Sequence, residues 1–254
     1  MAIGLHRTLR IPEDGRPRSV PSGLGMLPVF RIEDYAARVP GTWERTAGFF
    51  VPLRRCEALW IAFAGRWWRP HAISVAADGL NVVTGGPVCE GLAASPQDYV
   101  VVPDQVRLWG VNLSKGLVRQ FALGPPGLAQ PDSKCLSLTV YRPKPGRFRD
   151  LQPGVRYLDT EVCCMGMPAP AGEPVLNGRE GSRQKIYADE YGIDTWDVRD
   201  RTHVCVYLVS VPTFVRIVGE EPPPTPITEK EYARRGLPWL ATYAEQAVNG
   251  SCGG

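Results

Sequence analysis

Short apolar runs separated by turn residues dominate the first 220 positions of the chain. Runs of four to seven residues that are rich in β-branched and aromatic side chains, bounded by Gly, Pro or Asp, are typical of β-strands. They predict a mainly β fold, either an antiparallel β-sandwich or an irregular barrel. The strands expected from this pattern are residues 8–11, 49–53, 58–63, 72–76, 80–83, 99–102, 117–121, 136–141, 183–187 and 203–209.

Two local patterns refine this picture. Ala77-Asp78-Gly79 predicts a tight hairpin, because Asp-Gly tolerates the positive φ that such turns require. Apolar positions spaced three and four apart over residues 32–39 predict two helical turns. The longest apolar run, residues 204–218, is interrupted by polar residues and proline, and a membrane-spanning helix needs about 20 apolar residues. We therefore interpret this run as buried strand and expect no membrane span.

The last 35 residues have a different character. A proline-rich stretch at residues 222–226 predicts an extended polyproline linker. It leads into Thr228-Glu229-Lys230-Glu231, a capping box that begins a helix. We expect a β-rich core over residues 1–219 and a linker with a short C-terminal helical arm over residues 220–254. The apolar face of the arm must be buried against the core or a second copy of the chain, which would make a homo-oligomer.

The composition argues against some classes of function but does not indicate a particular one. The 27 Gly and 25 Pro residues suit a turn-rich β protein, and a net charge of +3 is too small to predict nucleic-acid binding. The chain has an odd number of cysteines, seven, and its first ten residues lack an apolar leader, so we expect free thiols and a cytoplasmic location. Three His, no C-x-x-C pair and no phosphate-binding loop predict neither a metal nor a cofactor.

The densest group of polar residues runs from Asp189 to Asp197. Asp194 and Asp197 offer carboxylates, and Trp196 offers an apolar wall, so these residues are one candidate for a polar ligand or hard-cation site. The alternative is a stitched turn, in which the carboxylates accept hydrogen bonds from nearby backbone N–H groups or pair with Arg183 and Lys185. The turn is the simpler interpretation.

His203 and Cys205 lie two apart on an expected strand, so their side chains share one face. With a carboxylate such as Asp197, they suggest a Cys–His–Asp site for nucleophilic catalysis. Side chains on one strand run parallel rather than toward each other, which argues against a nucleophile–base pair. The candidate ligand-binding residues are Asp194, Trp196, Asp197, His203 and Cys205; no catalytic residue is assigned.

A cluster of aromatic residues lies between two expected strands. Trp67 and Trp68 point to opposite faces of extended backbone, so one of them is a candidate for exposure beside Arg66 and Arg69. An exposed indole there could stack on a sugar, a base or a partner protein. The alternative is a core residue at a bent strand.

Four segments together carry a resemblance to a known family. They are residues 7–15 (RTLRIPEDG), 57–61 (EALWI), 184–197 (QKIY with GIDTWD) and 222–228 (PPPTPIT). Over most of its length the chain resembles an uncharacterised family of microbial and fungal proteins often labelled "integral membrane protein". The resemblance implies no activity and no site residue. The sequence thus favours a non-enzymatic binding or structural protein of unknown ligand; the alternative is a small-molecule hydrolase that uses His203, Cys205 and nearby carboxylates.

Overall fold

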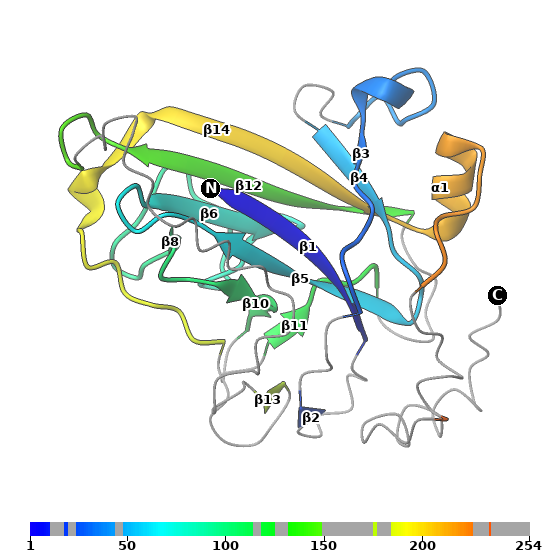
Figure 1. Cartoon of the computed structure of the whole chain (residues 1–254), viewed down its shortest axis with the longest axis horizontal. Coiled ribbons are helices and arrows are strands. Elements are labelled where there is room, and N and C mark those ends of the chain that lie inside the picture. The colour runs from blue at the N-terminus through cyan, green and yellow to red at the C-terminus, as the bar shows by residue number, and fades with distance from the viewer. Residues whose placement is uncertain are drawn as a thin grey trace, which may run out of the picture.

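The computed structural model describes residues 1–10, 24–43, 48–113, 118–124, 132–148 and 184–225, with residue 234 and the backbone of two paired strands, β2 (Arg18–Ser19) and β13 (Val175–Leu176). The chain is mainly β, which confirms the prediction, and its described sheets do not close into a barrel. Two sheets face each other across one apolar core (Figure 1).

The larger sheet has the order β3-β4-β14-β12-β6-β7, with β8 also paired to β6. Its two longest strands run antiparallel at its centre, and Thr139 of β12 lies opposite His203 of β14. All of its pairs are antiparallel except β4 with β14. The strands are β3 (Phe30–Arg31), β4 (Gly48–Pro52), β6 (His71–Ala77), β7 (Leu80–Asn81), β8 (Val100–Val102), β12 (Ser133–Pro143) and β14 (Trp196–Val209).

The smaller sheet has the order β1-β5-β9, and a separate pair, β10 with β11, lies beside it. These strands are β1 (Ala2–Leu9), β5 (Glu57–Ala64), β9 (Arg107–Leu108), β10 (Gly110–Asn112) and β11 (Val118–Gln120). Leu59 and Ile61 of β5 are fully buried against Leu138 and Val206 of the large sheet. Because side chains alternate along a strand, the residues next to Leu138 and Val206 must point to the outer face of the large sheet.

The run at residues 204–218 is not strand throughout, so that prediction was wrong. β14 ends at Val209, and a short helix, α1 (Val211–Val218), follows. The Ser210 hydroxyl accepts a hydrogen bond from the Thr213 N–H at 3.3 Å, and Pro212 lies in the first turn. These are ordinary signals for a helix start. Phe214 of α1 is buried in a second apolar cluster with Phe50.

Several smaller predictions can be compared directly. The 77–79 hairpin is confirmed, with φ of 51° at Asp78 and 79° at Gly79. Residues 32–39 form one 3-10 turn, η1 (Glu33–Tyr35), followed by further turns. The expected strand at 183–187 is wrong for its described part, where residues 184–187 are extended but unpaired with any sheet. Apart from Arg234, which is helical, the predicted arm helix lies outside the described residues. No described helix is long and apolar enough to cross a membrane.

Candidate functional site

The outer face of the large sheet carries a row of polar side chains across its central strands. Ser74 of β6, Thr139 of β12 and His203 of β14 lie side by side in register. With residues 88–91, which form a wall at one side, they line a depression of about 250 Å³. The complete lining is Ser74, Ala76, Val88, Cys89, Glu90, Gly91, Ser137, Thr139, Tyr141, Arg201 and His203.

His203 connects two neighbouring side chains in this row. Its Nδ1 lies 2.9 Å from the Thr139 hydroxyl, and its Nε2 lies 3.4 Å from the Cys205 sulfur. With the proton on Nδ1, the ring donates to Thr139 and Nε2 accepts the Cys205 thiol proton. A base in contact with a nucleophile and held by a third group is the geometry of activated thiols. The two side chains on β14 do meet, although neighbours on a strand were expected to run parallel.

Charged groups close the rim of the depression. Arg201 of β14 pairs with Glu90 of the wall at 3.6 Å, with both side chains well exposed. The Tyr141 hydroxyl donates to the Gly91 carbonyl at 3.4 Å, which ties the wall to β12. Burial and the neighbouring Cys205 raise the pKa of the Cys135 thiol to about 12, so that thiol is neutral at ordinary pH.

The acidic segment is a stitched turn, but its central residue is Asp189. One Asp189 oxygen accepts from the Tyr99 hydroxyl at 2.6 Å and from Trp196 Nε1 at 2.8 Å. The other accepts from the N–H groups of Tyr191 at 2.9 Å and Gly192 at 3.2 Å. Burial, followed by the Asp189 carboxylate, raises the pKa of Tyr99. The carboxylate is thus fully committed to the turn.

The other residues of this segment take different places. Asp194 is exposed on a 3-10 turn, η3 (Ile193–Thr195). Asp197 already lies on β14, where its carboxylate accepts the Arg199 N–H at 2.9 Å, as in an Asx turn. Trp196 is only 1% exposed, so its ring is a core side chain rather than the wall of an open site.

The five candidate residues therefore form two groups. Trp196 lies opposite Pro143 and His203 opposite Thr139, four positions apart on β12, because the pairing of β12 with β14 is irregular between Tyr141 and Pro143. At about 3.3 Å per residue, this spacing is about 13 Å. The structure brings His203 and Cys205 together, but it does not bring Asp194, Trp196 or Asp197 to them. A Cys–His–Asp arrangement with Asp197 is not formed.

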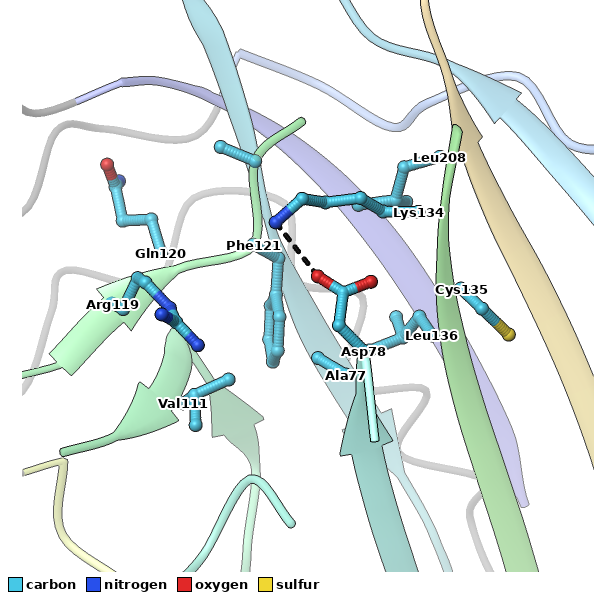
Figure 2. A pocket seen from close by; sticks show the side chains of 11 residues that line it. Ala77, Asp78, Val111, Arg119, Gln120, Phe121, Lys134, Cys135, Leu136 and Leu208 are labelled. Carbon is cyan, nitrogen blue, oxygen red and sulfur yellow. Dashed lines mark ion pairs between the residues drawn. The ribbon is translucent and has the colours of Figure 1, made fainter. Parts of the chain in front are cut away.

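A second, smaller depression lies between the β6–β7 hairpin, β11 and β12 (Figure 2). The Lys134 ammonium points toward the Asp78 carboxylate and pairs with it at 2.8 Å. The volume of this depression, about 20 Å³, has room for little more than a water molecule. We therefore place the candidate site at the larger depression.

Comparison with known proteins adds no assignment. No protein-family model matches the chain, and no curated protein or solved structure is significantly similar to it. Within the described part of the chain, no group of three or more His, Cys, Asp or Glu is arranged to hold a metal ion. The function must therefore be argued from the geometry of the depression alone.

Proposed function

We propose that the protein is a non-enzymatic binding protein that holds a small polar molecule in the outer-face depression. One observation carries this proposal: hydroxyl, imidazole, guanidinium and carboxylate groups from three strands and a loop converge on one concavity of about 250 Å³. A few convergent polar groups in a preformed concavity are the usual mark of a small-molecule site. The size suits a ligand smaller than a typical drug molecule.

The donors and acceptors of the depression favour a particular kind of ligand. Ser74 and Thr139 both donate and accept, and His203 does either according to its tautomer. A ligand with several hydroxyl groups uses such neutral partners without disturbing the Arg201–Glu90 pair. An anionic ligand would compete with Glu90 for Arg201. The site therefore favours polyols and sugars over phosphates.

The test is a ligand-observed NMR screen of small polyols, monosaccharides and hydroxy acids against the full chain. Hits should lose affinity in Thr139→Val and His203→Ala, since each change removes a hydrogen-bonding group from the depression. Thr202→Val is a matched control, because Thr202 is exposed and adjacent on β14 but points to the other side of the strand. Hits that bind Thr139→Val as well as the parent protein would refute the proposal.

A second candidate function is a small-molecule hydrolase, favoured by the 3.4 Å contact between His203 and Cys205. In this reaction the Cys205 sulfur attacks an ester carbonyl, His203 takes the thiol proton and gives it to the departing alcohol, and water then hydrolyses the thioester. p-Nitrophenyl acetate should give a burst of nitrophenol that Cys205→Ser abolishes. Cys89→Ser is the control, because Cys89 is an exposed thiol at the same depression. Equal loss in the two variants would indicate unspecific thiol acylation.

We further infer a cytoplasmic protein with no nucleic-acid partner that self-associates through residues 220–254. No disulfide joins the described cysteines, Cys56, Cys89, Cys135 and Cys205, which supports a reducing compartment. The small net charge of +3 supports the absence of a nucleic-acid partner. Deleting residues 220–254 should lower the molar mass measured by light scattering, and an unchanged mass would contradict the self-association.

A further inference from the structure

The turn between β5 and β6 presents two tryptophans at the edge of the molecule. Arg66 and Arg69 face each other in an antiparallel bridge, and the Arg69 N–H donates to the Arg66 carbonyl at 2.9 Å. This tight turn leaves Trp67 and Trp68 at its tip. Trp67 is 68% exposed, the highest value among the large hydrophobic side chains that the structure describes. The sequence alone left open whether either indole is exposed, and the structure shows that Trp67 is.

The arrangement of the rings narrows the choice of partner. The two indole rings are 5.6 Å apart at 89°, and the Arg66 guanidinium lies over the Trp68 ring at 5.5 Å. Stacking of successive bases or sugars needs accessible ring faces along a strand, and here the rings are perpendicular and one face of Trp68 is covered. Neither depression described above includes these four residues. The tip therefore suits a deformable surface better than an enclosed ligand.

We propose that the β5–β6 turn, residues 66–69, docks on the surface of a lipid bilayer that contains anionic lipids. Indole rings favour the boundary between headgroups and acyl chains, where the ring is buried and the N–H stays hydrated. The guanidinium groups of Arg66 and Arg69 flank the indoles and match lipid phosphates and carboxylates. This charge complementarity selects an anionic surface over a neutral one.

A neighbouring loop adds one exposed apolar side chain and an opposing charge. Val106 is 49% exposed and lies beside the end of β5, since its carbonyl accepts the Phe63 N–H at 2.9 Å. Asp104, which is exposed on the same loop, brings the opposing charge. Glu190, which is also exposed, lies within electrostatic reach of Asp104 and adds a second carboxylate, so the attraction is modest. The docking is therefore reversible and falls steeply with ionic strength.

The test is co-sedimentation of the full chain with phosphatidylcholine vesicles that contain or lack phosphatidylserine, at low and at high salt. We expect binding only with phosphatidylserine and only at low salt. Trp67→Ala should reduce the partition coefficient on the order of tenfold, by removing partly inserted apolar surface. Arg66→Gln with Arg69→Gln should reduce it roughly 25-fold, and Asp104→Asn should raise it by about fivefold, because each charge near an anionic surface contributes about fivefold.

Met26→Ser is the matched control, since Met26 is 65% exposed and lies outside the β5–β6 turn and its neighbouring loop. It should bind vesicles as the parent protein does. Three results would overturn the proposal: no association with phosphatidylserine vesicles at low salt, association that survives both Trp67→Ala and the double arginine variant, or binding of a single-stranded oligonucleotide in place of vesicles. Circular dichroism of each variant checks that the fold is kept.

Discussion

Removal of the Asp189 carboxylate should be among the most damaging single changes in the described part of the chain. This side chain accepts hydrogen bonds from Tyr99, Trp196, Tyr191 and Gly192. Tyr99 and Trp196 are each 1% exposed, so their donors have no ready access to water. Asp189→Ala therefore leaves two buried donors without an acceptor.

The magnitude follows from these two donors. A buried donor without a partner costs about 1–3 kcal/mol, which gives about 2–6 kcal/mol for the pair. A water molecule that enters the space of the carboxylate would satisfy one donor, so we expect a loss of about 1–3 kcal/mol. In Asp189→Asn the amide faces the Trp196 N–H, donor to donor, while the Tyr99 hydroxyl can rotate to accept. That variant should lose about 1–2 kcal/mol.

The assay is urea unfolding followed by tryptophan fluorescence and far-ultraviolet circular dichroism. Asp194→Ala is the matched control, because Asp194 is an exposed carboxylate in the same segment and should change the free energy of unfolding by no more than about 0.5 kcal/mol. Thermal unfolding should show a fall of about 2–4 °C for each kcal/mol lost. A loss below about 1 kcal/mol in Asp189→Ala, or an equal loss in Asp194→Ala, would refute the assignment of the turn to Asp189.

Three further predictions concern backbone strain and pH. Gly79→Ala should lower the free energy of unfolding by about 1–2 kcal/mol from backbone strain alone, because φ is 79° and no atom lies within 4 Å of the added Cβ. Gly41→Ala, which is equally open and has no positive φ, should be nearly neutral. Burial raises the pKa of Glu57 above its ordinary 4.5, so the contribution of Glu57 to stability is present below pH 4.5 and lost as pH rises through the folded-state pKa. The free energy of unfolding of the parent minus that of Glu57→Gln should therefore fall over this pH range. A difference that stays flat would contradict the shift. Burial lowers the pKa of His6, which is stacked on Trp60, below 6.5, so the contribution of His6 to stability is present above pH 6.5 and lost as pH falls through the folded-state pKa. In thermal melts His6→Gln should therefore be less sensitive to acid than the parent. Identical pH profiles of the two proteins would contradict this.

The sequence predicted several strand positions well where a run was short and bounded by turn residues, but the short run at 183–187 is not a strand in its described part. The 58–63 and 72–76 runs became β5 and β6 because both strands pack apolar side chains into the core. The failure at 204–218 came from treating hydrophobicity as the only signal. Ser210 and Pro212 begin a helix there, and the helix buries its apolar side just as a strand would. The parallel pairing of β4 with β14 was beyond local patterns, because it joins segments over 150 residues apart.

The candidate site was only half accessible to sequence reasoning. His203 and Cys205 were found because their spacing places them on one face of a strand. Thr139, their partner on β12, carried a weaker signal: small polar residues at alternate positions in the run Ser133, Cys135, Ser137 and Thr139. Glu90 and Arg201 meet only through tertiary packing. Asp189 was overlooked as the centre of the turn because its main donors, Tyr99 and Trp196, converge on it only in the folded chain.

The position of Cys205 bears on the choice between the two proposed functions. Cys205 is 8% exposed and belongs to the apolar cluster that contains Tyr207 and Phe214, whereas His203, two positions earlier, is exposed at the depression. The outer face of β14 thus changes from covered to open between these two residues. A thiol with one side in apolar packing is poorly placed to reach a substrate. His203 and Thr139 remain accessible as hydrogen-bonding groups in either case, so the geometry favours binding over thiol catalysis.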